Sequence, residues 1–515
     1  MKKKQLRWTL WTIASPFILF IILCILIYLP PIQNFLVDKA AVYASEATGM
    51  NISVGRISLS FPLNLVVTNV DAASPHNDTL LSVRRLQVNV QLLPLLKKQV
   101  EVDGISLQGA TVNSNDLIHG MKLNGTLGEL FISSHGVALD PETAIVNKVL
   151  LKDTDLSLCL NDTAAADTAA SDTTYWKIIL QDIDLQNVSF ALDMPLDSLS
   201  LAASLDNAIL RDGLIDLHKS AYSLQTFRIE NGRVRYDNGK PLAADSLSSG
   251  LDPSHIALTD IGVKLDSLYY GGRNMKAIIS QFVLKERSGV EIVSATGRMV
   301  SNDKVLRVPS LKLETRDSYL ELNAAMDWNA LDFKDEGLVS ARLMADIGKP
   351  DVVRFMGSMD EKFIRQYPSE PLRIRTGIDG DLNKLKLTTL TAELPGALGL
   401  FARGELTHLT DSLLRGGDIT LEAETKDLKF VSTLAEGIEI PYGTRLEGKF
   451  TMAGTKMGTD LLLMQPEAQA VVAADTIPIT VYNDSISVAD DFKMERAARL
   501  FAKYDLSRDR YEADL

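Results

Sequence analysis

The stretch Ile183-Asp184-Leu185-Gln186-Asn187-Val188-Ser189-Phe190 carries the pattern that decides the fold. Apolar and polar residues alternate up to Gln186, Asn187 interrupts the alternation, and a second alternating run follows. Alternation with a period of two is typical of a strand with one buried face, and Asn is common in turns and bulges. We therefore predict a strand that carries a turn or bulge residue at Asn187.

The same pattern occurs in three other places. The copies are Ile105-Ser106-Leu107-Gln108-Gly109-Ala110-Thr111-Val112, Val149-Leu150-Leu151-Lys152-Asp153-Thr154-Asp155-Leu156 and Phe227-Arg228-Ile229-Glu230-Asn231-Gly232-Arg233-Val234. In chain order the four copies start 44, 34 and 44 residues apart, unlike the fixed period of a propeller or a leucine-rich repeat. The sequence therefore predicts a mostly β chain, with one growing sheet and loops of variable length.

Alternating runs also flank these copies. They occur at 52–61 and 86–92 on the N-terminal side, and at 372–375, 400–406 and 446–452 on the C-terminal side. Residues 499–506 and 511–515 read as two arms of a hairpin, and a final strand with an open edge would invite aggregation. We therefore expect the 515 residues to be the N-terminal part of a longer architecture.

One internal helix is predicted at residues 351–366. Its apolar residues recur at helical spacing, and Pro368 follows its end. The members of this stripe are Val352, Phe355, Met356, Met359 and Phe363. The stripe fits a helix packed on the core of the sheet, and it also fits a lid over a groove.

The N-terminus carries a predicted transmembrane anchor, Leu10 to Leu29, with Phe20 near its centre. Twenty residues without a charge span about 30 Å, one hydrocarbon core. Lysines at 2–4 and Arg7 precede it, so the positive-inside rule places the N-terminus in the cytoplasm and the rest on the other side. A cleaved signal peptide is the alternative, but its apolar region should be shorter.

The predicted organisation follows the chain in order. Residues 1–9 are cytoplasmic, residues 10–29 form the anchor, and residues 32–48 form a juxtamembrane amphipathic helix. Residues 50–350 form a repeating β-groove with a flexible insertion at 161–174. The amphipathic helix at 351–366 follows, and residues 370–515 form the truncated continuation of the groove.

Composition argues against several classes of function. The net charge of −13, with no basic cluster after residue 7, disfavours nucleic-acid binding. Two cysteines, Cys24 and Cys159, cannot form a disulfide framework. The six histidines lack metal-ligand spacing, and no phosphate loop or nucleophile elbow occurs. We expect no enzymatic activity, no catalytic or metal-binding residues and no cofactor.

The N-terminal region resembles the AsmA-like superfamily, and most closely its TamB (translocation and assembly module) branch in Bacteroides-type bacteria. The resemblance rests on the anchor followed by Ile32-Gln33-Asn34-Phe35-Leu36-Val37-Asp38-Lys39-Ala40-Ala41, Thr48-Gly49-Met50-Asn51-Ile52-Ser53-Val54-Gly55-Arg56-Ile57 and Phe61-Pro62-Leu63. It implies a taco-shaped, repeating β-groove. It also implies a single-pass inner-membrane protein, with the bulk of the chain in the periplasm, that serves phospholipid passage and outer-membrane biogenesis with an outer-membrane barrel protein as partner.

The resemblance implies that the apolar members of the repeats are candidates to line a lipid-binding groove. They are Ile105, Leu107, Val112, Ile183, Leu185, Phe190, Phe227, Ile229 and Val234. An ordinary closed β core would produce the same alternation, and one bulge reverses the facing of all later residues. A rival function is a scaffold that offers a strand edge to outer-membrane β-barrel proteins, and a third is a structural periplasmic spacer.

Ten triplets of Asp, then Ser or Thr, then an apolar residue or Thr occur where about three are expected by chance. They resemble an O-glycosylation signal of exported proteins in the same bacteria, although Asp-Ser and Asp-Thr also favour turns. Either reading places them on loops. The candidate acceptors are Thr79, Thr163, Thr168, Ser198, Ser246, Ser267, Ser412, Thr476 and Ser485.

Overall fold

The computed structural model describes most of the chain after residue 48. The described residues are 39, 41, 42, 45, 49–60, 64–74, 78–90, 102–114, 120–138, 142–161, 176–240, 250–332, 337–356, 361–433, 442–466, 494–505 and 510–514. They are mostly β, which confirms the predicted class. The chain divides into unit 1, Met1–Pro241 with Ser254–Lys264, and unit 2, Leu242–Pro253 with Leu265–Leu515.

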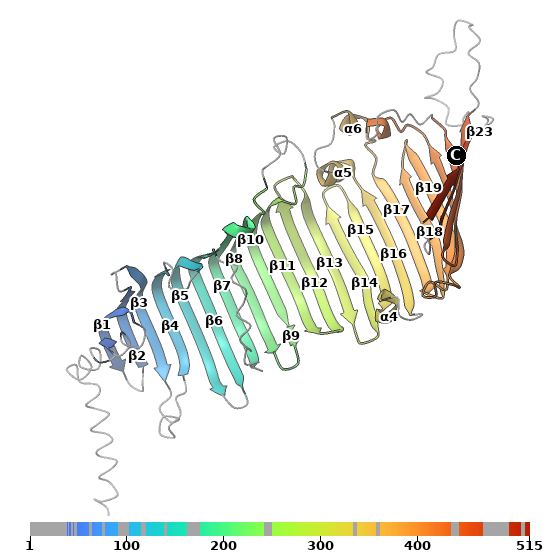
Figure 1. Cartoon of the computed structure of the whole chain (residues 1–515). Coiled ribbons are helices and arrows are strands. Elements are labelled where there is room, and N and C mark those ends of the chain that lie inside the picture. Colours follow the sequence, from blue (N-terminus) through green and yellow to red (C-terminus); the bar gives the residue numbers. More distant parts are fainter. Residues whose placement is uncertain are drawn as a thin grey trace, which may run out of the picture. The chain divides into compact units, whose positions relative to one another are not determined.

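Unit 1 is a sheet of long strands (Figure 1). Its strands are β1 (Asn51–Ser60), β2 (Asn64–Ala73), β3 (Thr79–Val90), β4 (Val102–Asn113), β5 (Met121–Ala138), β6 (Thr143–Leu160), β7 (Lys177–Met194), β8 (Leu199–Asp216), β9 (Ala221–Leu224) and β10 (Thr226–Asp237). Gln225 separates β9 from β10, and both pair with β8. Strand β11 (His255–Gly271) begins in unit 1 and ends in unit 2.

One pair in unit 1 departs from the antiparallel pattern. Strands β6 and β7 run parallel, with Thr143 beside Lys177 and Leu158 beside Leu192. The connection between them therefore leads from one end of the strand pair to the other. The repeat pattern does not predict this crossover, because alternation of apolar residues is the same in parallel and antiparallel strands.

Unit 2 is an antiparallel meander in which each strand from β12 to β24 pairs with the next. The strands are β12 (Asn274–Glu286), β13 (Glu291–Ser301), β14 (Val305–Thr315), β15 (Tyr319–Asp327), β16 (Leu338–Ile347), β17 (Leu372–Asp381), β18 (Lys384–Leu394), β19 (Leu398–Thr407), β20 (Gly416–Thr425), β21 (Arg445–Ala453), β22 (Lys456–Pro466), β23 (Met494–Asp505) and β24 (Arg510–Asp514). Strands β23 and β24 confirm the predicted terminal hairpin.

In the described residues from 49 onward, helices are few and short. They are η1 (Pro195–Asp197), α4 (Trp328–Leu331), α5 (Lys349–Met356), α6 (Glu361–Gln366) and η2 (Val431–Thr433). The helix predicted at 351–366 corresponds to α5 and α6, and residues 357–360 between them lie outside the described residues. Gly357 is the residue type that ends helices and Asp360 the type that starts them, so the sequence contained the signal.

The buried clusters lie at the strand ends of unit 2. One consists of Phe363, Tyr367, Leu394, Ala397, Leu428 and Phe430, and the other of Ala330, Val339 and Leu382. Figure 1 shows α5 and α6 at one end of the strands of this unit and α4 at the other. Apart from hydrogen-bonded neighbours, the main contacts among the described elements join α4 to β15, α6 to η2 and η1 to β8.

Several predictions fall outside the described residues. These include the anchor from Leu10 to Leu29, nearly all of the helix at 32–48, and all but the first residue of the insertion at 161–174. Among the residues that the structure describes, no helix has the length and apolar character needed to cross a bilayer.

Candidate functional site: an apolar face of the sheet

The register of unit 1 aligns apolar residues in rows that cross the strands. Directly opposed residues of neighbouring strands share a face of the sheet. Row 1 consists of Leu59, Leu65, Val88, Ile105, Ile132, Val149, Ile183, Leu210 and Phe227. Row 2 consists of Ile57, Val67, Leu86, Leu107, Leu130, Leu151, Leu185, Ala208 and Ile229. Row 3 consists of Ile52, Ala72, Leu81, Val112, Gly125, Leu156, Phe190, Ala203 and Val234.

The nine candidate lining residues all lie in these rows. Ile105, Ile183 and Phe227 belong to row 1. Leu107, Leu185 and Ile229 belong to row 2, and Val112, Phe190 and Val234 to row 3. Sequence reasoning missed the partners on β5, β6 and β8 that join them into continuous rows, because the register between strands depends on loops that the repeats do not fix.

A line of residues in the left-handed conformation separates row 2 from row 3. Its members with positive φ are Asn69, Gly109, Asp153, Asn187 and Asn231, with φ between 49° and 62°. All lie at one level, where the ladder lacks a pair between neighbouring strands. The repeats predicted a turn or bulge residue at Gly109, Asp153, Asn187 and Asn231. The structure gives each of the four a left-handed conformation, but the register continues across it without the extra residue of a bulge.

The left-handed residue reverses the facing of the strand. A β-carbon placed on Gly232 would lie 3.2 Å from Cγ2 of Ile229, although the two residues are three apart. Likewise, a β-carbon on Gly213 would lie 3.0 Å from Cδ2 of Leu210, with Asp212 at φ 51° between them. In an uninterrupted strand, residues three apart point to opposite faces. The interruption therefore keeps row 3 on the same face as rows 1 and 2.

Polar residues form rows between the apolar ones. One row consists of Arg56, Thr68, Arg85, Gln108, Glu129, Lys152, Gln186, Asn207 and Glu230. Side chains of the left-handed line also bond to one another: Asn187 donates to Asp153 at 2.8 Å, and Asn231 donates to Asp206. Unit 1 therefore has an apolar face and a polar face.

Unit 2 repeats this division. Row 4 consists of Ala345, Ile374, Ala392, Leu400, Ala423 and Leu446, on strands β16 to β21. Row 5 consists of Leu343, Thr376, Leu390, Ala402, Leu421 and Gly448 on the same strands. Residues of the intervening positions form ion pairs, among them Arg375 with Asp346 at 2.7 Å and Lys449 with Asp418 at 3.2 Å.

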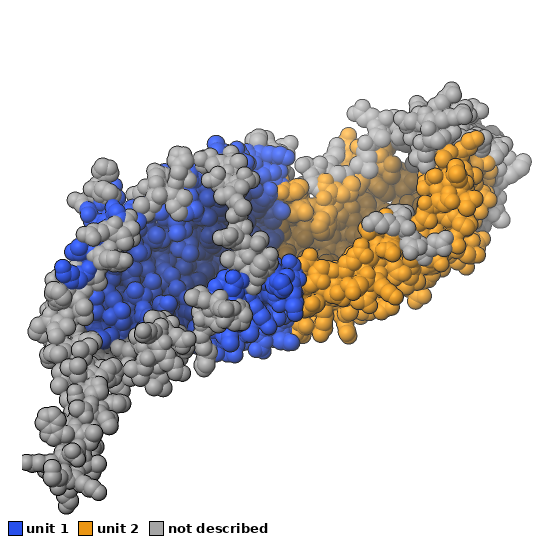
Figure 2. Space-filling model, turned by 60° about the horizontal axis from the view of Figure 1, so that its bottom comes forward, with its two compact units in different colours: residues 1–241, 254–264 blue, residues 242–253, 265–515 orange. Residues whose placement is uncertain are grey.

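The apolar rows are crowded, yet several of their large side chains are open to solvent, among them Leu81, Ile105 and Phe190, which are 36–38% exposed. Ala402 is 2% exposed, and Ala345 and Ala208 are also buried. A small side chain on a single-layer sheet is hidden only where its neighbours lean over it, as they do on a concave face. Figure 2 shows that each unit has a hollowed face.

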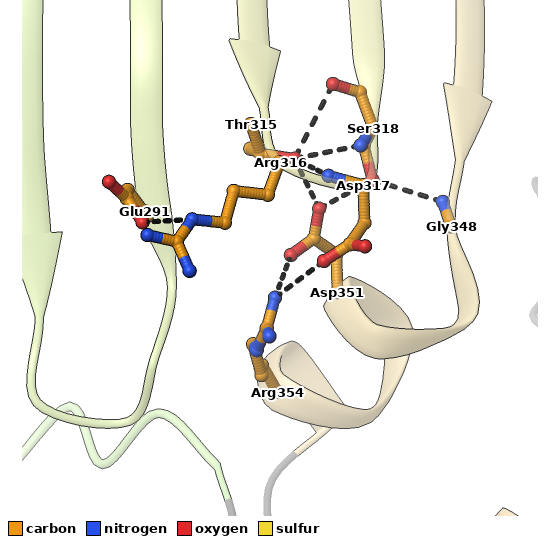
Figure 3. Close-up of polar contacts among 8 residues, drawn as sticks. All are labelled: Glu291, Thr315, Arg316, Asp317, Ser318, Gly348, Asp351 and Arg354. Carbon is orange, nitrogen blue, oxygen red and sulfur yellow. Dashed lines mark hydrogen bonds and ion pairs between the residues drawn. The ribbon is translucent and has the colours of Figure 1, made fainter.

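Helix α5 is fastened to the rim of unit 2 by a buried carboxylate. Asp351 is 1% exposed and accepts hydrogen bonds from the hydroxyls of Thr315 and Ser318, the latter at 2.6 Å (Figure 3). Arg354 donates to Asp351 at 3.0 Å and to Asp317 at 2.9 Å. Burial by itself would lower the pKa of Arg354, but these hydrogen bonds outweigh it and raise the pKa above its ordinary value.

Helix α4 is fastened at the opposite strand end. The Trp328 indole donates to the carbonyl of Asn302 at 2.8 Å, and Arg273 lies 5.7 Å from the centre of the Trp328 ring. Both helices therefore have polar anchors, and each places one apolar residue in a cluster at the strand ends, Val352 of α5 and Ala330 of α4.

The candidate glycosylation sites are only partly on loops. Ser198 lies in a turn, and Ser412 lies in the β19–β20 loop beside Asp411, whose pKa is lowered by hydrogen bonds from the backbone of Leu413 and Leu414. Thr79 and Ser267, however, lie in strands β3 and β11, so the loop prediction is wrong for these two. The triplets that contain Thr79 and Ser267 are also compatible with the alternation of polar and apolar residues in a strand. The described residues do not include Thr163, Thr168, Ser246, Thr476 or Ser485.

Comparison with known proteins gives no matching family model and no matching curated protein. Within the described residues, no three histidine, cysteine or acidic side chains gather as a metal site would require. The most extensive feature of the described residues is therefore the set of apolar rows on one face of the sheet in each unit.

Proposed function

We propose that this chain is an inner-membrane-anchored periplasmic protein whose apolar face carries phospholipids between the inner and outer membranes. Through this role it supports outer-membrane biogenesis. The observation that carries the proposal is the set of continuous apolar rows on one face, with large side chains such as Leu81, Ile105 and Phe190 more than a third exposed. The predicted anchor and the resemblance to the TamB branch supply the compartment.

The rows offer acyl chains a dry path, while headgroups remain in water. Moving an acyl chain through water costs about 0.8 kcal/mol for each exposed CH₂ group. A path of apolar side chains across many strands lowers this barrier without an energy source. The face of a sheet presents side chains and offers no unpaired backbone N–H or C=O groups with which a polypeptide could pair. A hydrocarbon chain, which needs no such partners, is therefore favoured as its occupant.

Site-specific photo-crosslinking tests the proposal. A benzophenone amino acid at Leu107 or Leu185 of row 2 should capture phospholipid in cells. The same group at Gln108 or Gln186, one residue away on the polar face, should capture little. Equal capture at both faces, or none at Leu107 and Leu185, would refute the conduit.

The crosslinks also separate this function from the rival one. A scaffold for nascent β-barrel proteins would yield protein adducts at strand edges and no lipid adducts on row 2.

A further inference from the structure

The loop between β19 and β20, residues 408–415, displays two adjacent leucines. Leu413 is 80% exposed and Leu414 is 63% exposed. Single exposed apolar residues are ordinary on a protein surface and need no explanation, but adjacent ones form a contiguous apolar patch. The patch on this loop therefore needs an occupant that removes it from water.

Hydrogen bonds within the loop hold the backbone that presents the two leucines. The Asp411 carboxylate accepts from the backbone amide of Leu413 at 2.8 Å and from that of Leu414 at 3.2 Å. The amide of Arg415 donates to the carbonyl of Asp411 at 2.9 Å. Because these bonds fix the turn, the leucines stay at the surface instead of folding back onto the sheet.

The loop is also fastened at both of its ends. The amide of His408 donates to the carbonyl of Asn383 in the β17–β18 turn at 2.9 Å, and Leu409 packs in the α4 cluster. The amide of Gly454 in the β21–β22 turn donates to the carbonyl of Arg415 at 2.6 Å. The leucines therefore project from a firm edge of unit 2 that consists of three connected turns.

These three turns carry more basic than acidic side chains. The basic residues are Lys384, Arg415 and Lys456, and the acidic ones are Asp381 and Asp411. Both carboxylates accept hydrogen bonds from backbone amides of their own turns, whereas the two lysines are exposed. Apolar side chains beside basic ones match the surface of a bilayer, where phosphate groups lie next to hydrocarbon.

A comparison with Leu196 separates this patch from ordinary exposure. Leu196 of η1 is 64% exposed, but it stands alone and is followed by Asp197, whose charge an anionic membrane would repel. The patch of Leu413 and Leu414 is also small for a protein partner, since a stable interface buries about 800 Å² on each side. A bilayer needs no matching shape and is therefore the favoured occupant.

We infer that the β19–β20 loop docks on a lipid bilayer, with Leu413 and Leu414 inserted below the headgroups and Lys384, Arg415 and Lys456 beside the phosphates. Amphipathic elements of this kind insert about 5–10 Å into the boundary between headgroups and acyl chains. The contact adds a second membrane attachment to the predicted anchor. It goes beyond the proposed conduit, and either can fail without the other.

Depth measurement on the full chain tests the inference. The chain, with Cys24→Ala and Cys159→Ser, is reconstituted in liposomes of phosphatidylethanolamine and phosphatidylglycerol and carries a nitroxide at Leu414→Cys or, as the matched control, at Leu196→Cys. Electron paramagnetic resonance compares collisions with oxygen, which concentrates in hydrocarbon, and with a water-soluble nickel complex. We expect oxygen to dominate at 414 and nickel at 196. Intact mass confirms that Ser412, a candidate glycan acceptor, is unmodified.

Substitutions then test the named side chains, with the nitroxide at Leu413→Cys. Leu414→Ser should lower the ratio of immersed to water-exposed probe about tenfold, and Lys456→Gln about fivefold. Leu196→Ser and Lys219→Gln, at exposed positions of unit 1, are the matched controls and should leave the ratio unchanged. Circular dichroism checks that each variant is folded.

Three results would overturn the inference while leaving the conduit intact. The first is a probe at 414 that the nickel complex reaches as readily as the probe at 196. The second is spin–spin broadening at 414 without a preference for oxygen, which would show that a second copy of the chain covers the patch. The third is a ratio that Leu414→Ser and Lys456→Gln change no more than their controls do.

Discussion

Asn187 shows how a single residue determines which side of a strand is apolar. Its φ of 51° lies in the left-handed region, which most L-residues occupy at a cost of about 1 to 2 kcal/mol. Asn, Asp and Gly tolerate that region best, and these types occupy the line from Asn69 to Asn231. The repeats predicted the positions of these interruptions for this reason, since both the break in alternation and the residue type are local, but they did not distinguish a bulge from a left-handed residue that keeps the register.

We expect Asn187→Ala to lower the free energy of unfolding of unit 1 by about 1 kcal/mol more than Asn187→Gly. Both variants lose the hydrogen bond to Asp153, but only alanine places a β-carbon in the left-handed conformation. Urea denaturation followed by circular dichroism measures the difference. Equal stability of the two variants would show that the backbone at 187 is not strained.

At the scale of elements, the helices at the strand ends were harder to predict. The apolar stripe from Val352 to Phe363 fitted either a helix packed on the core of the sheet or a lid over a groove. In the structure, the two ends of this stripe have different surroundings. Phe363 is 2% exposed in the α6 cluster, whereas Phe355 of α5 is 56% exposed. Helical spacing alone could not separate them, because the partners that bury Phe363 are distant in sequence: Leu394 of β18, and Leu428 and Phe430 after the end of β20.

Phe363→Ala should therefore destabilise the α6 end of unit 2 by about 3 to 5 kcal/mol, because it leaves a cavity among Tyr367, Leu394 and Phe430. Phe355→Ala should cost less than about 0.5 kcal/mol. Hydrogen exchange of the amides in 361–372 reports the local free energy. Comparable effects of the two variants would contradict the assignment of Phe363 as the core residue.

The anchor of α5 gives a second comparison. Asp351→Ala removes the acceptor of three hydrogen bonds and should raise exchange in 349–356 by an amount equal to about 2 to 3 kcal/mol. Arg316→Ala removes the nearby ion pair with Glu291, whose arginine is well exposed, and should cost less than about 1 kcal/mol. If Arg316→Ala loosens α5 as much as Asp351→Ala does, the buried carboxylate is not the anchor.

At the scale of the whole molecule, the chain differs from a typical domain, which buries one face of each sheet against a second layer. Here the buried clusters sit at strand ends, while each unit by itself carries apolar rows across its strands, with side chains such as Ile105 and Phe190 more than a third exposed. The repeats predicted the apolar residues but not the rows, because cross-strand register and the parallel β6–β7 pair depend on loop connections. Alternation of apolar and polar residues is equally compatible with a closed core. Whether the apolar face is open could therefore be seen only in the three-dimensional arrangement of the strands.

The central claim is that the apolar rows bind lipid, and lipid content of the purified chain tests it most directly. The full chain and its Leu185→Lys variant would be extracted without detergent into polymer nanodiscs, delipidated to the same extent and recharged with phosphatidylethanolamine, with Gln186→Lys as the control on the polar face. Circular dichroism confirms folding, and quantitative mass spectrometry gives lipid molecules per chain. We predict that Leu185→Lys retains several-fold less lipid than the unaltered chain and Gln186→Lys; equal lipid content in all three would contradict the lipid-carrying face.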